Sequence, residues 1–269
     1  MRLLILGDLV GRSGRDAVIA ALPGLRAQCR ADFVAVNAEN ASHGFGLAPE
    51  MAEALFAAGA DAITLGNHAW DRREIIPYIA REPRLLRPLN FPPGTPGAGA
   101  AVITLPDHRK ILIAQAMGRL FMDPLDDPFR VVEELLSRHK LGLNVQAALI
   151  DFHAEASSEK MAFAHAFDGR VSAVVGTHTH IPTADHQILP GGTAYATDLG
   201  MCGDYDSVIG MTKAPSVTRF IRKMPGERLA PAEGPATICG ALIETDDKGL
   251  ATCIQPLRMG GRLLPTMPG

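Results

Sequence analysis

Short apolar runs alternate with amphipathic segments over residues 1–90 of the chain. Buried strands are predicted for three of these runs, which occupy residues 3–6, 33–36 and 62–65. Helices are predicted between them, at about 14–29 and 48–58, because apolar residues recur there every three or four positions. A further helix is expected to begin near Asp71, with this aspartate as its N-cap. This order of elements predicts an α/β sheet with right-handed crossover connections.

The pattern continues less regularly through the rest of the chain. Residues 87–99 are rich in proline and glycine, which excludes a regular helix or a central strand and predicts an ordered surface connection. Beyond them the pattern predicts strands at 101–105, 110–114, 147–150 and 171–175, and helices at 128–139 and from about residue 155. Two apolar stretches, 236–243 and 250–255, flank a polar turn and predict an antiparallel hairpin. Since no repeat or linker interrupts the pattern, residues 1–269 are expected to form one domain.

Composition narrows the class of protein. With 47% hydrophobic and 20% charged residues, the chain can bury a large core. Its net charge of -3 gives no electrostatic basis for wrapping nucleic acid, although a small anionic substrate is compatible if bound cations supply positive charge. No apolar run reaches the roughly 20 residues that span a bilayer, and no signal peptide precedes the first strand, so a cytoplasmic protein is expected. The scattered cysteines are expected to be reduced thiols.

Side chains that can bind metal follow several of the predicted strands. They are Asp8, Glu39, Asn40, Asn67, His153, His178 and His180. Open parallel sheets bind their ligands at the carboxyl ends of the strands, so these side chains are expected to lie close together. Oxygen and imidazole donors without thiolate suit a hard or borderline divalent cation. Singly, each residue has an ordinary role in a turn, a cap or a surface loop; together they favour a two-metal hydrolase.

Two short motifs carry most of this signal. Gly66-Asn67-His68 offers an amide oxygen as a metal ligand and an imidazole that can donate a proton or anchor a phosphate. In Gly176-Thr177-His178-Thr179-His180, histidines two positions apart point to the same side of an extended chain. Glu39 has two carboxylate oxygens and can bridge two ions, which lie about 3.5–4 Å apart in two-metal sites.

The same residues resemble the ordered motifs of the calcineurin-like metallophosphoesterases. Over nearly its full length the chain more closely resembles the YmdB family, bacterial phosphodiesterases that act on 2′,3′-cyclic nucleotides. This resemblance also includes Gly7-Asp8-Leu9-Val10-Gly11, Glu39-Asn40-Ala41, Asp151-Phe152-His153-Ala154-Glu155 and Thr197-Asp198-Leu199-Gly200-Met201. In the wider superfamily a histidine usually stands where this chain has Val10, and an aspartate where it has Glu39. The YmdB-like subgroup shares both departures, which implies Asn40 as the replacement ligand.

The resemblance implies a layered αββα sandwich with mixed sheets and a dinuclear metal site at the strand ends. It implies two iron or manganese ions, one held by Asp8, Glu39, Asn40 and His180 and the other by Glu39, Asn67, His153 and His178. A hydroxide bridging the ions would attack phosphorus, with His68 as the proton donor to the leaving oxygen. The substrate would be a 2′,3′-cyclic nucleotide, opened at its 2′ bond to give the 3′-phosphate.

Other functions remain open from the residues alone. The same scaffold could carry a phosphomonoesterase or 5′-nucleotidase, or a metal-bound regulatory or RNA-binding protein with incidental catalysis. The net negative charge of the chain argues against a stable nucleic acid complex. A homo-oligomer could form if the apolar loop at 116–129 and the C-terminal segment pack between subunits.

Four residues near the predicted ligands have open roles. Glu155 is favoured over Asp151 as the acceptor that orients the second ring nitrogen of His153. His43 and Trp70 could contact substrate, or could pack beneath their loops.

Overall fold

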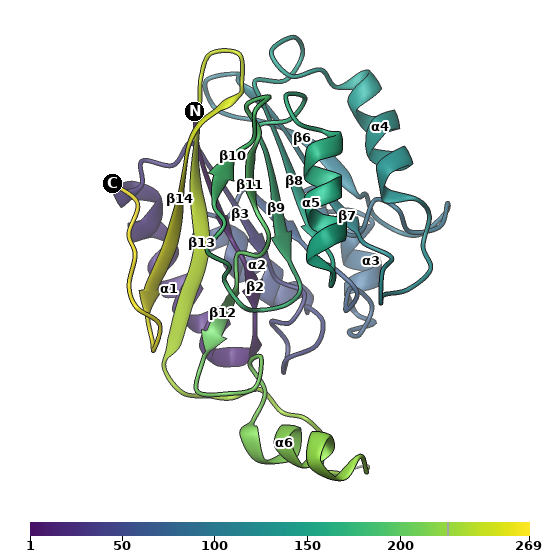
Figure 1. Ribbon diagram of the computed structural model, residues 1–269, viewed down its shortest axis with the longest axis vertical. Coiled ribbons are helices and arrows are strands. Elements are labelled where there is room, and N and C mark those ends of the chain that lie inside the picture. Colours follow the sequence, from purple (N-terminus) through teal and green to yellow (C-terminus); the bar gives the residue numbers. More distant parts are fainter. Residues whose placement is uncertain (225) are drawn as a thin grey trace.

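The computed structural model describes residues 1–224 and 226–269, which form two facing β-sheets flanked by helices (Figure 1). One sheet contains β1 (Arg2–Leu6), β2 (Asp8–Leu9), β3 (Phe33–Asn37), β4 (Ala62–Thr64), β5 (Leu85–Leu86), β12 (Met201–Asp204), β13 (Ala236–Thr245) and β14 (Ala251–Gly260). The other contains β6 (Ala100–Thr104), β7 (Lys110–Met117), β8 (Ala147–His153), β9 (Ala173–Thr177), β10 (Gln187–Ile188) and β11 (Ala194–Ala196). The helices are α1 (Gly11–Gln28), α2 (Pro49–Ala58), α3 (Ile75–Ile79), α4 (Pro128–Arg138), α5 (Ser157–Ala166) and α6 (Lys213–Arg222).

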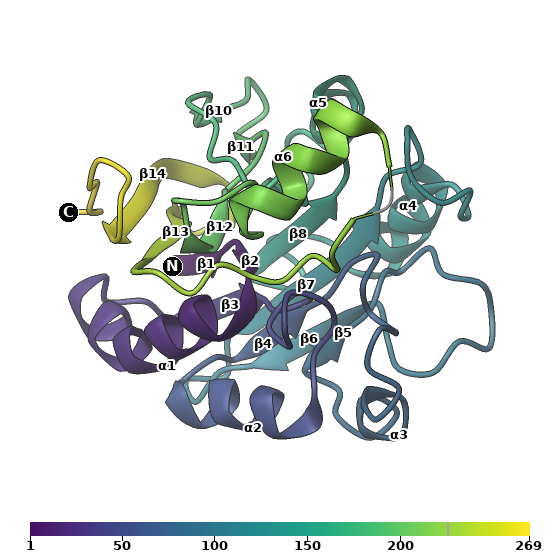
Figure 2. The same cartoon turned by 90° about the horizontal axis from the view of Figure 1, so that it is seen from below.

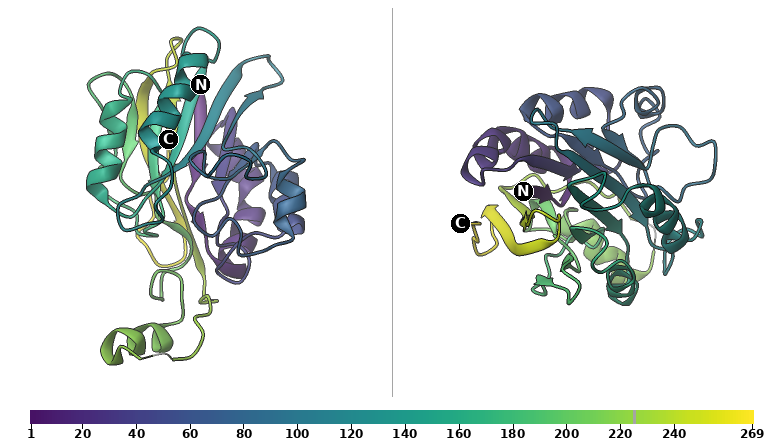
Figure 3. Two further views of the ribbon diagram at one scale, coloured as in Figure 1. Left: turned by 90° about the vertical axis from the view of Figure 1, so that its right-hand side faces the viewer. Right: turned by 90° about the horizontal axis from the view of Figure 1, so that it is seen from above.

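The core is layered because the side chains of each strand alternate between two faces. In β1, Leu3 and Ile5 pack between the two sheets, whereas Leu4 and Leu6 pack with residues of α1 and α2. In the second sheet, Ile113 of β7 faces the space between the sheets, and the opposite face packs against α4 and α5. The layers therefore run helix, sheet, sheet, helix (Figure 3), which confirms the predicted αββα sandwich.

Both sheets are mixed, as predicted, and both have a parallel part. Strands β1, β3, β4 and β5 pair in parallel, while β13 joins β1 in the antiparallel sense. In the second sheet β7, β8, β9 and β11 are parallel, and β6 and β10 are antiparallel edges. The parallel strands of the two sheets end on the same side of the molecule (Figure 2). Loops from both sheets can therefore contribute side chains to one site.

Besides several short strands that were not predicted, the structure departs from the predicted helices in two places. The helix expected from Asp71 begins only at Ile75, and the Asp71 carboxylate accepts a hydrogen bond from Nδ1 of His68 instead of capping a helix. The pattern also did not predict α6, which stands away from the body of the molecule (Figures 1 and 3). Phe220 and Ile221 of α6 are each 75% exposed, so burial does not explain the apolar positions of this helix.

None of the helices in the described part of the chain is both long and apolar enough to cross a membrane.

The four cysteines are all free thiols, as expected from their spacing.

Candidate dinuclear metal centre

The seven predicted ligands lie in one connected group at the carboxyl ends of the parallel strands. Asp8, Glu39, Asn40, His153 and His180 are buried, whereas Asn67 and His178 are partly exposed. The strands contribute these side chains from both sheets, because β1, β3 and β4 lead to Asp8, Glu39 and Asn67, and β8 and β9 lead to the histidines. A buried polar group with one solvent-facing side is suited to binding a small ion or ligand.

Three potential metal-binding atoms surround Nε2 of His153. Nε2 of His153 lies 2.9 Å from Oδ1 of Asn67, 3.1 Å from Oε1 of Glu39 and 3.1 Å from Nδ1 of His178. Donors around an ion with bonds of about 2.1 Å lie about 3.0–3.4 Å apart in tetrahedral or octahedral geometry. The three distances from Nε2 of His153 therefore match the spacing of donors around a metal ion, and the ligand atoms of Glu39, His153 and His178 all lie within 4.8 Å of one another.

The protonation of His153 is fixed by residues behind it. Oγ1 of Thr177 donates to Oδ1 of Asp151 at 2.6 Å, so the same hydroxyl accepts from Nδ1 of His153 at 2.9 Å. Nε2 of His153 then faces the other side chains of the group, where a metal ion would take the place of its proton. The predicted role of Glu155 as the acceptor for His153 is wrong; its carboxylate lies 3.2 Å from Nε2 of His178. Thr177, itself hydrogen-bonded to Asp151, takes that role. Asp151 lies behind the site because β8 extends as far as His153.

A second group of donors adjoins the first. Nδ2 of Asn40 lies 3.1 Å from Oε1 of Glu39 and 3.2 Å from Nε2 of His180. Since Nδ1 of His180 donates to the carbonyl oxygen of Ile209 at 2.7 Å, its Nε2 is left free to face Asn40. A half-turn of the Asn40 amide about its Cβ–Cγ bond would exchange the nitrogen for an oxygen at the same place. Asp8 lies close to both groups: its Oδ2 accepts from the backbone nitrogen of His178 at 3.1 Å, and its Oδ1 is buried without a hydrogen-bond partner.

The charges of the group favour a bound cation. Burial raises the pKa of Asp8 to about 6. Burial alone would also raise the pKa of Glu39, but the adjacent His153 outweighs it and holds that pKa well below its usual range. Burial lowers the pKa of His153, yet the charge of Glu39 more than compensates and raises it to about 9. Burial and the neighbouring His153 lower the pKa of His178 to about 3, so this imidazole is a neutral donor.

The residues present therefore fit metal ions. The carboxylates that stabilise positive charge on His153 would equally stabilise a divalent cation at the point where the lone pairs converge. An orphaned buried carboxylate oxygen on Asp8 is unusual in a folded protein and is accounted for by a ligand. Glu39 lies between the two donor groups, which is the place of a bridging ligand.

The backbone around the site is adapted to bring these atoms together. Gly66 has no room for a side chain, because a Cβ atom there would lie 2.4 Å from Oε2 of Glu39 and 2.5 Å from Nε2 of His153. His178 and His180 both have positive φ angles, 99° and 68°, which non-glycine residues adopt only where the surroundings hold them. The carboxylate of Asp198 provides this restraint by accepting from both the backbone nitrogen and the hydroxyl of Thr179, at 3.0 and 2.8 Å.

His68 lies beside the predicted metal ligand Glu39, and its side chain is partly exposed to solvent. Its backbone nitrogen donates to Oε2 of Glu39 at 3.0 Å, and its Nδ1 lies 2.9 Å from Oδ2 of Asp71. The ring packs edge to face against Phe45, with 5.1 Å between the ring centroids. These contacts fix the imidazole on one side and leave Nε2 for another partner.

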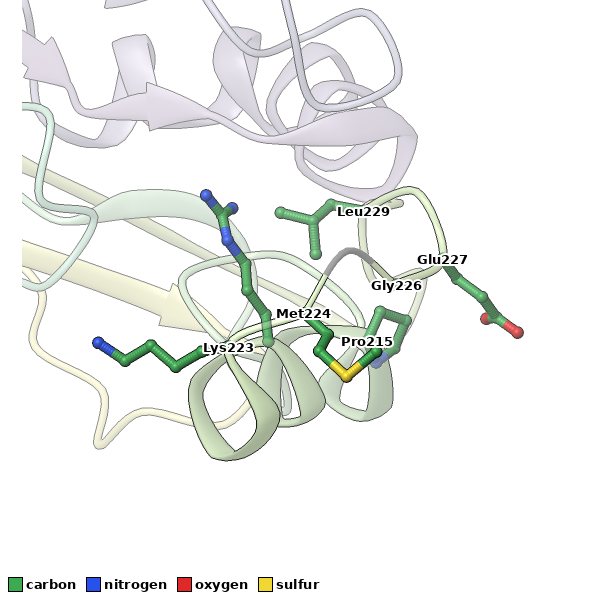
Figure 4. A pocket seen from close by; sticks show the side chains of 7 residues that line it. Pro215, Lys223, Met224, Gly226, Glu227 and Leu229 are labelled. Atoms are coloured by element: carbon green, nitrogen blue, oxygen red, sulfur yellow. The ribbon is translucent and has the colours of Figure 1, made fainter.

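A separate cavity of about 540 Å³ lies between α6 and residues 226–229 (Figure 4). Met224 and Leu229 are among the side chains that line it, and Glu227 points outward from it. None of the seven predicted ligands contributes to its wall.

Replacing Thr177 with valine is expected to weaken metal binding about 10- to 100-fold, because the hydroxyl that orients His153 is lost. The matched control is Thr64→Val. Oγ1 of Thr64 also donates to Asp151 at 2.6 Å, but Thr64 does not contact His153 through a hydrogen bond. Metal titration calorimetry on both variants makes the comparison, and equal losses of affinity in the two would refute the orienting role.

Comparison with known proteins places the chain in a family. A model of the YmdB-like protein family matches residues 4–257. The chain is 46% identical over 248 residues to a Bacillus subtilis (strain 168) protein named 2′,3′-cyclic-nucleotide 2′-phosphodiesterase, and the match covers 92% of each chain. A crystal structure of a hypothetical protein from Thermus thermophilus has a TM-score of 0.90 at 43% identity, covering 97% of this chain and 100% of that one. A novel phosphatase from Mycoplasma pneumoniae has a TM-score of 0.89 at 34% identity, covering 100% of this chain and 95% of that one.

The family match includes every predicted ligand from Asp8 to His180. Both solved structures share the fold over nearly the whole chain, so the resemblance is not confined to a few motifs. This protein therefore belongs to the YmdB-like protein family, as its strand-end motifs predicted.

Proposed function

We propose that the protein is a dinuclear metal-dependent phosphodiesterase that hydrolyses 2′,3′-cyclic nucleotides at the 2′ bond to give 3′-phosphates. The observation that carries this proposal is the gathering of Glu39, Asn67 and His178 within 3.1 Å of Nε2 of His153. The name of the Bacillus subtilis relative supports the choice of substrate and of the bond broken. A two-metal site suits a phosphodiester because its charge must be neutralised before a nucleophile can approach phosphorus.

The residues divide into two metal sites that share one carboxylate. Glu39, Asn67, His153 and His178 would hold one ion, and Asp8, Glu39, Asn40 and His180 would hold the other. Such ions would polarise the phosphate oxygens and lower the pKa of a water molecule between them, so that it becomes a nucleophile at neutral pH. The donor set of carboxylate, amide and imidazole is compatible with iron or manganese, and we propose these metals.

His68 would transfer a proton to the leaving 2′-oxygen. The Asp71 carboxylate occupies Nδ1, so Nε2 is the nitrogen that would donate the proton. Because Glu39 also accepts from the backbone nitrogen of His68, the imidazole is held in a fixed position beside the donors.

The test is hydrolysis of 2′,3′-cyclic AMP by purified protein loaded with manganese or ferrous iron, with products separated by chromatography. We expect 3′-AMP to accumulate. Accumulation of 2′-AMP would contradict the proposed bond cleavage, and release of adenosine with inorganic phosphate would identify a phosphomonoesterase activity instead.

The same assay examines His68. His68→Ala is expected to lower kcat for 2′,3′-cyclic AMP about a hundredfold, the lower range for general acid catalysis. With bis-p-nitrophenyl phosphate the loss should be much smaller, since p-nitrophenolate leaves as a stable anion without a proton. Equal losses on both substrates would argue against proton donation.

A further inference from the structure

A second cavity, of about 390 Å³, lies next to the proposed catalytic centre. Its wall is formed by His43, Arg72, Arg228, Leu229, Ala230 and Pro231. These residues come from three separate segments: the loop after Glu39, the loop after His68, and the segment that leads into β13. The catalytic mechanism uses none of them.

The contacts of this cavity connect it to the catalytic centre. Arg72 follows Asp71, which holds Nδ1 of His68, and His43 lies two residues before Phe45, which packs on the His68 ring. On the opposite wall, Pro231 pairs with Met211, two residues after the carbonyl of Ile209 that accepts from His180. A substrate bound at the metal donors therefore has this cavity as its neighbour on the His68 side.

The cavity is rich in hydrogen-bond donors and contains no carboxylate. In the described part of the chain, neither Arg72 nor Arg228 forms an ion pair with an acidic side chain. Nε of Arg72 is buried and has no hydrogen-bond partner. That nitrogen is enclosed by protein atoms, so a ligand would meet the outer guanidinium nitrogens of Arg72 and Arg228, which an anion can accept from.

The hydrogen-bond donors of Arg72 and His43 are held in place by contacts within the protein. Nη2 of Arg72 donates to the carbonyl oxygen of Ser42 at 3.3 Å and lies 3.0 Å from Nδ1 of His43. Because Nδ1 accepts from arginine, the neutral His43 ring carries its hydrogen on Nε2, which makes that nitrogen a further donor. The loop can pass this close because Gly44 and Gly46 have positive φ angles, and a Cβ at Gly46 would lie 2.8 Å from Cγ of Arg72.

We infer that this cavity binds the phosphodiester that precedes the cyclic phosphate in an oligoribonucleotide. The preferred substrate class is then a short RNA that ends in a 2′,3′-cyclic phosphate, with the free cyclic mononucleotide as a poorer substrate. This inference rests on the proposed function. A phosphodiester fits because it has only acceptor oxygens, whereas the charged and imidazole groups of the cavity offer only donors. A site for one phosphate is compatible with the net charge of -3, which gives no basis for a long RNA groove.

The experiment compares two substrates of the metal-loaded full-length protein. They are 2′,3′-cyclic AMP and adenylyl-(3′→5′)-adenosine 2′,3′-cyclic phosphate, which adds one upstream phosphodiester. We expect kcat/KM to be about tenfold higher for the dinucleotide, the effect of roughly one charge-assisted hydrogen bond. A plot of log kcat/KM against log salt concentration should be steeper for the dinucleotide by about 0.7, because one additional phosphate is neutralised.

Variants assign this preference to the cavity. Arg228→Met and Arg72→Met are each expected to remove most of the dinucleotide preference, read as the ratio of the two kcat/KM values. Arg138→Met is the matched control, since Arg138 is exposed at the end of α4 and lines no part of this cavity. It should keep the preference of the native protein. Circular dichroism checks that each variant is folded, and Arg228 is the safer test because its side chain is exposed.

A dinucleotide with a neutral methylphosphonate linkage separates phosphate recognition from recognition of the added nucleoside. It is expected to behave like the mononucleotide, and a preference that survives this change would overturn the assignment to phosphate. Equal kcat/KM for the mononucleotide and the natural dinucleotide would overturn the inference while leaving the proposed function intact. Failure to hydrolyse either substrate would instead overturn the proposed function, and the inference with it.

Discussion

Replacing Glu39 with glutamine is expected to abolish metal retention and hydrolysis together. Glu39 lies 3.1 Å from Nε2 of His153 in one donor group and 3.1 Å from Nδ2 of Asn40 in the other. Glutamine keeps the size of the side chain but removes its negative charge and one of its two acceptor oxygens. Both ions would lose their shared ligand, so kcat/KM should fall at least about 10⁴-fold, equivalent to about 5.5 kcal/mol of transition-state stabilisation.

Measured metal content identifies the cause of that loss. Elemental analysis after gel filtration is expected to find less metal per chain in Glu39→Gln than in the native protein. Glu53→Gln makes the same chemical change on the exposed surface of α2 and serves as the control. A Glu39→Gln protein that retains two ions per chain and most of its activity would rule out the bridging role.

Replacing Lys160 with methionine is expected to destabilise the fold strongly. Lys160 and Asp198 are both fully buried, and their charged groups lie 2.8 Å apart. Removing the lysine leaves a buried carboxylate without its counter-charge, which costs about 3–5 kcal/mol. For a domain of this size, the midpoint of thermal unfolding is expected to fall by about ten degrees.

The effect should extend to the metal centre. Asp198 restrains Thr179, which lies between the two histidines with positive φ angles, so Lys160→Met is also expected to weaken metal binding. The double variant Lys160→Met with Asp198→Asn removes both charges and should recover part of the lost stability. Thermal unfolding monitored by circular dichroism compares the three proteins. A double variant less stable than Lys160→Met would show that the buried charge is not the cause.

The positions of the ligands were predictable because they follow from strand periodicity. Each predicted ligand comes at or near the end of a buried strand, and parallel strands bring such ends together without further information. The same periodicity predicted an α/β sheet and the closing hairpin, whereas the arrangement in two facing sheets was implied by the family resemblance. The short strands β10 and β11 and the exposed helix α6 were missed, because two or three residues, or a helix without a buried face, leave no clear hydrophobic pattern.

The residues behind the ligands could not be derived in this way. Thr177 lies within the motif at 176–180. Its role in orienting His153 depends on a hydroxyl that faces Asp151 on the neighbouring strand. The wrong prediction for Glu155 has the same cause. Glu155 was favoured because it is close to His153 in sequence, whereas the pairing of β8 with β9 places Thr177 beside His153. Asn40 was identified from its neighbour Glu39, yet only the structure shows that its amide lies between Glu39 and His180.

The place of β13 in the sheet has a consequence for how the protein is made. This strand pairs along the whole of β1, the first strand synthesised, and also pairs with β12, which in turn pairs with β2 at Asp8. During translation, β1 therefore cannot pair with β13 until residues 236–245 have been synthesised. Contacts so distant in sequence form slowly. Although the last predicted ligand is His180, the carboxylate of Asp8 is expected to reach its final position only after residues 236–245 have left the ribosome. Metal binding through Asp8 should then require that β13 is already in place.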